Sequence, residues 1–290
     1  LLFIASTAKN IYDPAAYSYW SERTDYSRRG FVVAIYETSW SLSFLLGMPA
    51  VGWLMARNSA HAWQFPFWSL AGMSLVALFA LQRVLRNPAP HVHTQNSRAH
   101  TLQRWRIVLV DTRVWSGLAL GFLVSAANES VLVILGAWLE NSFGLSLAAL
   151  GFASFVIGAA ELLGEGGVMA WVDRLGKRRA VAYGLIASAC AFASLHVIAV
   201  SVSGALLGLF LLFLTFEFTL VATLPLMSEL VPSARAQTMS LNMTMLLLGR
   251  MAGALLGGML FQLGLGWNLV LGVSLNLIAL VVLQVGLRKK

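Results

Sequence analysis

The sequence contains very little charge for its length. Only 11% of its 290 residues are Asp, Glu, Lys or Arg, whereas 58% are hydrophobic. Soluble domains carry about 25% charged residues and roughly 45–50% apolar residues. A water-soluble domain of this size could not cover its surface with so few charges. The composition therefore excludes an ordinary soluble protein and predicts a chain whose solvent is lipid.

Cysteine is nearly absent, and the histidines do not form a recognisable metal site. The single cysteine, Cys190, lies inside an apolar run, so no disulfide framework can form. His91 and His93 stand together in a polar loop, and the other three histidines are scattered along the chain. Neither arrangement has the ligand spacing of a metal site. We therefore expect no metal ion and no cofactor.

Motifs of ATP-driven pumps and of enzymes are also missing. No G-x-x-x-x-G-K-[ST] loop occurs, so nothing indicates that this chain uses ATP. A membrane-embedded enzyme would need paired His and Glu ligands, or a serine with a base at membrane depth, and His196 alone provides neither. We expect a protein that is not an enzyme. The net charge of +8 does not indicate nucleic-acid binding either, because the basic residues are confined to short gaps between apolar runs.

What the sequence has in abundance is long apolar runs. A helix needs about 20 mostly apolar residues to cross the hydrocarbon core, and these runs lack the alternation of barrel strands. The sequence therefore predicts an all-α integral membrane protein. Its eight complete transmembrane helices are expected at 31–55, 64–85, 114–137, 145–171, 180–200, 204–228, 237–262 and 267–286. Residues 1–20 indicate part of a ninth helix.

Basic residues alternate from one gap to the next. Three arginines lie between residues 21 and 30, four between 86 and 106, and four basic residues lie in "DRLGKRR" at 173–179, whereas the intervening gaps hold one or none. Lys and Arg in short loops mark the cytoplasmic side of a membrane protein. We therefore expect a multi-pass protein of the plasma membrane (the inner membrane in a bacterium) with a cytoplasmic C-terminus.

A polar segment at 86–113 divides the chain. It contains "NPAPHVHTQNSRAH", which has two prolines and no apolar periodicity, and it therefore predicts a linker. The following "LQRWRIVLV" predicts a short basic amphipathic helix at the membrane surface. Six apolar runs follow this linker.

Six helices after a basic linker, with a charged turn between the second and third of them, resemble the major facilitator superfamily. In that family two six-helix halves flank one central passage. Both halves can carry a loop of the form G-x-x-x-D-R-x-G-R/K-R/K at this position. The residues that match are Asp173, Arg174, Gly176, Lys177 and Arg178, whereas Met169 replaces the leading glycine. The resemblance implies that this loop acts as a conformational latch.

Two further stretches support the resemblance. The segment 229–258, "ELVPSARAQTMSLNMTMLLLGRMAGALLGG", is similar to the connection between the family's tenth and eleventh helices. The stretch "GMPAVG", with Gly47, Pro49 and Gly52, is similar to the Gly-Pro signature of the fifth helix in proton-coupled exporters, although Met48 separates its glycine from its proline.

The resemblance also implies an organisation for the whole chain. The chain corresponds to family helices four to twelve, so that helices one to three are expected to be missing, and it opens abruptly on Leu1 rather than Met. Residues 1–85 would be the remainder of the N-terminal helix bundle and 86–113 the cytoplasmic linker. Residues 114–290 would be the C-terminal six-helix bundle.

Several ionisable side chains are expected near the middle of the membrane. A charge there costs at least about 2.5–3.5 kcal/mol, so each needs a partner or a function. Arg250 can neutralise Glu161 or Glu217, and the remaining carboxyls must be protonated or face a water-filled cavity. The candidates for proton coupling or substrate binding are Glu129, Glu217, Arg250, Glu161 and Asn128. Each of Glu129 and Glu217 has a purely structural role as the alternative.

Other residues are expected to serve conformation and packing. Glu165 lies one helical turn after Glu161, on the cytoplasmic side, and we assign it to the charged turn. Gly249, Gly253 and Gly257 recur every fourth residue and predict close helix packing. Gly47, Pro49 and Gly52 are assigned to packing or to a kink in their helix.

These observations favour secondary active transport of a small organic solute by alternating access, with proton-coupled efflux as the leading hypothesis. The expected partners are that solute, protons and the lipid bilayer, and the protein is expected to be a monomer. One alternative is a sugar or metabolite permease or facilitator, for which Asn128, Asn242 and Gln262 would supply polar contacts. The other is a truncated membrane protein that does not transport.

Overall fold

The computed structural model describes most of the chain as helix. It covers Ala8, Tyr12, Thr38, Ser39 and residues 41–57, 63–84 and 98–287. Within these residues the chain forms α-helices with one π-helical and one 3-10 segment, and no strand. The prediction of an all-α protein is therefore confirmed.

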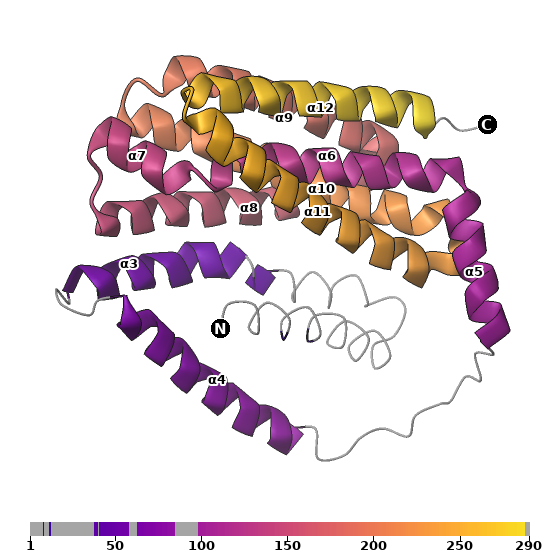
Figure 1. Cartoon of the computed structure of the whole chain (residues 1–290), viewed down its shortest axis with the longest axis horizontal. Helices are drawn as coiled ribbons and strands as arrows, with labels where there is room; N and C mark the ends of the chain where they lie inside the picture. The colour runs from indigo at the N-terminus through magenta and orange to yellow at the C-terminus, as the bar shows by residue number, and fades with distance from the viewer. Residues whose placement is uncertain are drawn as a thin grey trace.

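Figure 1 shows the described helices in chain order. They are η2 (Ser43–Gly47), α3 (Met48–Arg57), α4 (Gln64–Val84), α5 (Arg98–Val110), α6 (Thr112–Leu132), α7 (Leu135–Phe143), α8 (Leu147–Leu175), α9 (Lys177–Ile198), α10 (Val202–Leu230), η3 (Pro232–Ala234), α11 (Arg235–Phe261) and α12 (Leu265–Gly286).

Seven helices in the described part of the chain are long and apolar enough to cross a membrane. They correspond to seven of the eight spans expected from the sequence. The eighth, at 31–55, is described only as the shorter apolar helix Ser43–Ala56. The rest of that span and almost all of the partial helix at 1–20 lie outside the described residues.

One predicted boundary was wrong. The helix expected to end at 137 continues as α6 and α7 to Phe143, where Gly144 ends it with a φ of 63°. A turn at Val133 and Ile134 separates α6 from α7. Just before it, the Ser130 hydroxyl donates to the Ala127 carbonyl, a bond to the preceding turn that bends helices.

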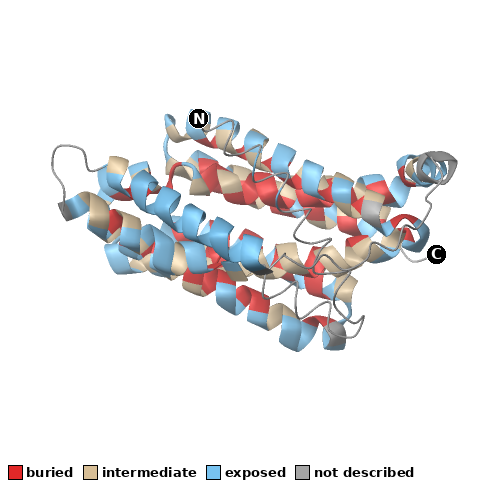
Figure 2. Cartoon of the chain, turned by 90° about the horizontal axis from the view of Figure 1, so that it is seen from below, coloured by how far each residue is buried: buried red, intermediate tan, exposed pale blue. Residues whose placement is uncertain are grey.

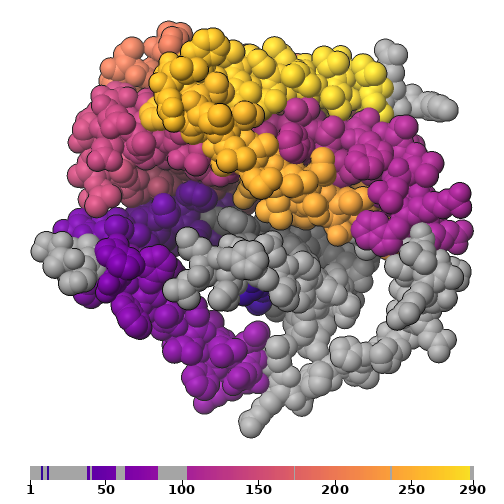
Figure 3. All heavy atoms as spheres, viewed as in Figure 1, coloured from indigo at the N-terminus to yellow at the C-terminus, as the bar shows by residue number. Residues whose placement is uncertain are grey.

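Helices α6 to α12 pack lengthwise into one bundle, which we call the C-terminal bundle (Figure 1). Buried residues gather along the inner faces of its helices (Figure 2). Helix α3 lies along α8, whereas α4 projects away from the C-terminal bundle (Figure 3). Nearly every described side chain of α4 is exposed. A helix that is apolar on all sides suits a lipid environment.

Three glycines bring the backbone of α11 onto α6. A Cβ atom at any of them would overlap a backbone carbonyl oxygen of α6. The three contacts are Gly249 with Phe122, Gly253 with Ala126 and Gly257 with Ser130. Both members of each pair advance by four residues, so the two helices run parallel and in fixed register. The side chain of Asn268 secures this contact from α12, because its amide donates to the carbonyls of Ser130 (2.8 Å) and Gly257 (2.9 Å).

The short helix expected in the linker is present as α5, and it packs against the end of the C-terminal bundle. A small apolar cluster joins it to α6, α10 and η3. The buried members of this cluster are Val108, Val114, Leu118, Met227, Val231 and Ala234. The linker helix therefore has a fixed position relative to the C-terminal bundle.

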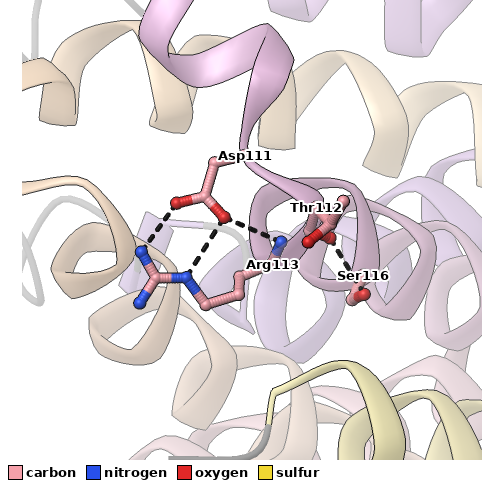
Figure 4. Close-up of polar contacts among 4 residues, drawn as sticks. All are labelled: Asp111, Thr112, Arg113 and Ser116. Atoms are coloured by element: carbon pink, nitrogen blue, oxygen red, sulfur yellow. Dashed lines mark hydrogen bonds and ion pairs between the residues drawn. The ribbon is translucent and has the colours of Figure 1, made fainter. Parts of the chain in front are cut away.

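Asp111 forms the corner between α5 and α6 (Figure 4). Its carboxylate caps α6 by accepting from the backbone N–H of Arg113 at 2.9 Å, and it pairs with the guanidinium of the same residue at 2.7 Å. The hydrogen bond from the Arg113 side chain holds the pKa of Asp111 below its usual value. The indole of Trp115 donates back to the Leu109 carbonyl at 2.8 Å, which ties the two helices together.

We expect Gly253→Ala to destabilise the protein by about 1–3 kcal/mol, because the added methyl group must push two helix backbones apart. Gly258→Ala is the matched control, since no atom lies within 4 Å of a Cβ at that position. Thermal unfolding in detergent measures both. Equal unfolding temperatures for the two variants would contradict the close α6–α11 contact.

Removing the carboxyl of Asp111 tests the α5–α6 corner. Asp111→Ala loses a helix cap and should cost about 0.5–2 kcal/mol, whereas Asp111→Asn keeps a capping oxygen and loses only an exposed ion pair, worth about 0.2–1 kcal/mol. Because the folded pKa is lowered, the ion-pair contribution is present above the ordinary aspartate pKa of about 3.9. It is lost as the pH falls through the folded value. Chemical denaturation across this range measures the difference, and a larger loss for Asn than for Ala would contradict the capping role.

Candidate functional site

Four ionisable residues lie close to the midpoints of their helices. Glu161 is the central residue of α8, and Glu129, Glu217 and Arg250 lie near the centres of the α6–α7 span, α10 and α11. A helix rises about 1.5 Å per residue, so we expect all four at a similar depth in the membrane. In transporters with this kind of helix arrangement, substrate and ion sites lie near the bilayer midplane. We call these four residues the midplane group.

Arg250 is the positive centre of the midplane group. It follows Gly249, whose contact with α6 places this part of α11 next to α6. Its guanidinium acts electrostatically on the carboxyls of both Glu129 and Glu161. One cation therefore serves carboxyls on two helices, α6 and α8. A structural arginine in such a position keeps acidic groups from being left as isolated charges in a medium of low dielectric constant.

The carboxyls of the midplane group differ in burial. Glu161 is only 8% exposed, whereas Glu129 and Glu217 are half-buried. Glu217 lies where α10 crosses α8, because a Cβ atom at Gly164 would be 3.0 Å from the Cβ of Glu217. Half-buried acids at this depth can exchange protons with a cavity more readily than a buried one can. This difference separates Glu129 and Glu217 from Glu161.

Buried polar side chains lie on the same helices. Ser125 and Asn128 of α6 and Asn242 of α11 are each 4% exposed or less. Within the described part of the chain, the Ser125 hydroxyl, the Asn128 carbonyl oxygen and both amide atoms of Asn242 make no hydrogen bond. Such groups usually have a partner, which can be water or a ligand. The sequence had indicated two members of this set, Asn128 as a candidate site residue and Asn242 as a polar contact for a permease.

Glu165 lies in a different place from the one expected. The sequence assigned it to the charged turn, but it is buried, at 5% exposure, and its Oε1 accepts a hydrogen bond from the Ser41 hydroxyl at 2.9 Å. The acid that pairs with the turn is Glu229 of α10, which forms an ion pair with Lys177. Glu165 therefore contacts the segment just before η2 (Ser43–Gly47).

The charged turn connects α8 to α9 and contacts the ends of α10 and α12. Gly176 ends α8 and begins α9 with a φ of 80°, a conformation that favours glycine. Lys177 reaches α10, and Arg178 donates to the carbonyl of Gln284 near the end of α12 at 3.0 Å. A cation at the C-terminal end of a helix also complements the helix dipole. Arg174 is exposed, and the side chain of Asp173 lies outside the described residues.

An apolar cavity of about 500 Å³ lies apart from the midplane group, between α9 and α12. Its lining includes Phe192, His196, Trp267 and Ser274. None of the candidate residues takes part in it. In the described part of the chain, no group of three His, Cys, Asp or Glu side chains is placed to hold a metal ion.

Sequence reasoning missed two residues that organise the site. Ser41 bonds to a residue 124 positions away, and no local pattern could have indicated that contact. Asn268 stands at the start of an apolar run, where an amide is unusual, and that position could have drawn attention to it. Its two hydrogen bonds lock the α6–α11 contact that carries Arg250.

Comparison with known proteins identifies the family and the fold of the chain. The family model described as Major Facilitator Superfamily matches residues 1–227 and again 118–289. An uncharacterised MFS-type transporter of Bacillus subtilis (strain 168), YceJ, is 26% identical over 228 residues, which are 76% of this chain and 55% of the relative. The chain thus spans about half the length of that curated relative.

A solved structure has the same fold. It is a bacterial homologue of the human lysosomal transporter Spinster in an inward-facing, unoccupied conformation, and it matches 94% of this chain and 72% of its own, with a TM-score of 0.62 and 15% identity. The helices, their order and these matches define a multi-pass membrane protein. The chain belongs to the major facilitator superfamily.

Replacing the central cation tests the midplane group. We expect Arg250→Gln to destabilise the protein by about 3 kcal/mol, because removing one partner leaves buried acids uncompensated. Adding Glu129→Gln and Glu161→Gln to this variant should restore most of the loss. Arg235→Gln, at the exposed start of the same helix, is the control. Thermal unfolding in detergent measures these variants, and a loss that the added substitutions do not relieve would argue against electrostatic coupling.

Proposed function

We propose that the protein is a secondary active transporter that exports a small organic solute in exchange for protons. The observation that carries this proposal is the midplane group. In it the half-buried carboxyls of Glu129 and Glu217 and the buried carboxyl of Glu161 lie near the midpoints of their helices, as Arg250 does. A carboxyl that gains a proton from one side and releases it to the other couples proton flow to transport. Membership of the family supports transport by alternating access.

Within this proposal the acids have different roles. Glu129 and Glu217 exchange protons or hold a cationic group of the substrate, because they are half-buried and lie on different helices of the C-terminal bundle. Glu161 is buried between a like charge, Glu165, and an opposite charge, Arg250. The close contact of α6 with α11 keeps Glu129 and Arg250 in register.

The proposal extends to the organisation of the protein in the cell. The C-terminal bundle corresponds to one six-helix half, and residues 1–85 belong to the other half, with 86–113 as the cytoplasmic linker. The protein lies in the plasma membrane with its C-terminus in the cytoplasm, as its basic gaps favour, and it works as a monomer. The turn at 173–178 acts as a conformational latch by holding the ends of α9, α10 and α12 together.

A sugar or metabolite permease is the second candidate. The buried amides of Asn128 and Asn242 favour it, because the Asn128 carbonyl oxygen and both amide atoms of Asn242 lack hydrogen-bond partners among the described residues. A hydroxylated substrate could supply such partners. In this case the acids of the midplane group would be structural.

Transport in vesicles distinguishes the two candidates. With the protein reconstituted and a pH gradient imposed, we expect added lipophilic cations to dissipate the gradient and sugars to leave it unchanged. Glu129→Gln or Glu217→Gln should reduce the cation-driven dissipation to the level of empty vesicles, because an amide cannot carry the proton. Glu140→Gln, an exposed position on α7, is the control.

Sugar uptake that depends neither on pH nor on Glu129 and Glu217 would contradict antiport. That result would identify a facilitator and leave the acids of the midplane group with a structural role.

A further inference from the structure

The N-terminal part of the chain meets the C-terminal bundle along a seam between η2–α3 and α8. The two helical segments of this seam run antiparallel, since Gly52 contacts Gly151 while the earlier Leu45 contacts the later Gly158. At Gly158 a Cβ atom would lie 2.5 Å from the backbone nitrogen of Leu45 and 2.7 Å from the Ser41 carbonyl oxygen. The backbones of the two halves therefore touch, and little side-chain bulk separates them.

Pro49 explains the unusual helix in this seam. A proline has no N–H to donate, and its ring clashes with the carbonyl four residues earlier, which here belongs to Leu45. The turn before it widens into the π-helix η2, in which the N–H of Met48 reaches back to the Ser43 carbonyl. π-helical turns occur frequently at functional sites. Ser41 lies just before this turn and is 1% exposed.

A polar contact crosses the seam at Ser41. Its hydroxyl donates to Oε1 of Glu165 on α8 at 2.9 Å, and both residues are buried. Farther along the seam, the close backbone contacts are made at glycines, Gly158 with Leu45 and Gly52 with Gly151. A bond to a carboxyl is the kind of contact whose strength changes with protonation, because charged acceptors form bonds roughly twice as strong as neutral ones.

We propose that the hydrogen bond from Ser41 to Glu165 is a proton-sensitive latch between the two halves. In this assignment Glu165 is a positioning residue that sets the balance between the two arrangements of the halves. The ionised carboxylate holds η2 against α8, and a proton on Glu165 weakens the bond and releases the seam. The idea rests on the proposed function, because it gives proton binding a route to the movement of the halves.

The surroundings of Glu165 suit this role. Glu161 lies one turn away on α8, and its electrostatic neighbours are Glu165 and Arg250. Glu217 faces the adjacent Gly164 from α10. The described part of η2 and α3 brings no ionisable group to the seam before Arg57. Protonation of Glu165 is therefore linked to the charge state of the midplane group.

A measurement of conformation tests the latch without substrate or gradient. Cys190 is exposed and is the one cysteine of the sequence, so Cys190→Ser provides a cysteine-free background. Spin labels are then attached at Arg83→Cys on α4 and Ser233→Cys in η3, both exposed positions. Pulsed electron paramagnetic resonance gives the populations of the inter-half distances, titrated between about pH 4.5 and 8.5 to span the carboxyl range.

We expect Ser41→Ala and Glu165→Gln each to shift the population ratio about tenfold in the same direction, because bonds to charged acceptors contribute at least this much. The double variant should shift it no further. Acidification should shift the unsubstituted protein in that same direction, and both single variants should lose this response. Ser41→Thr, which keeps the hydroxyl, should restore it, and Ser43→Ala is the matched control.

An unchanged ratio in Ser41→Ala, additive shifts in the double variant, or a full pH response in Glu165→Gln would overturn the latch. Failure of the proposed function is distinguishable, because it is measured as transport that persists in Glu129→Gln and Glu217→Gln, whereas the latch is measured as a shift of the inter-half distances in Ser41→Ala and Glu165→Gln without substrate or gradient. If the latch responds to pH as expected but no proton-coupled transport is measured, the latch is supported and the proposed function is contradicted.

Discussion

The cost of placing charge in hydrocarbon governs the rest of this structure. An ionisable group at the bilayer centre persists only with a partner, a proton or water. Arg250 meets this requirement for carboxyls on two helices, and its position depends on how closely α11 can approach α6. That approach in turn depends on glycines, because any side chain at those three positions would meet the α6 backbone. The electrostatic role of Arg250 therefore depends on the close backbone packing of α11 against α6.

Glycines also determine the packing at the seam between η2–α3 and the C-terminal bundle. Glycines allow η2–α3 and α8 to touch, and the polar contact at Ser41 lies where the glycine contacts end. Close backbone packing resists small deformations, so movement between the halves would proceed by discrete steps rather than gradual bending. The proposed latch would link protonation of Glu165 at this seam to a movement of the helices. The charged turn, in contrast, makes its described contacts inside the C-terminal bundle.

Much of the fold could be predicted from the sequence, because hydrophobic length and basic gaps act locally along the chain. The seven described spans and the midplane depth of Glu129, Glu161, Glu217 and Arg250 follow from such reasoning. The end of α7 was misplaced, since Glu140 and Asn141 looked like a loop although the helix continues to Gly144. The partners of Glu165 and Lys177 could not be predicted from the sequence, because they depend on how helices far apart in the chain face each other.

The most direct test of the account is whether substrate binding displaces a proton from the midplane carboxyls. The purified protein in weakly buffered detergent solution is mixed with tetraphenylphosphonium, a lipophilic cation, and the proton release is measured. The account predicts release by the unsubstituted protein and by Glu140→Gln, and its loss in Glu129→Gln or Glu217→Gln. Binding of the cation without proton release, or release that persists in both variants, would contradict it.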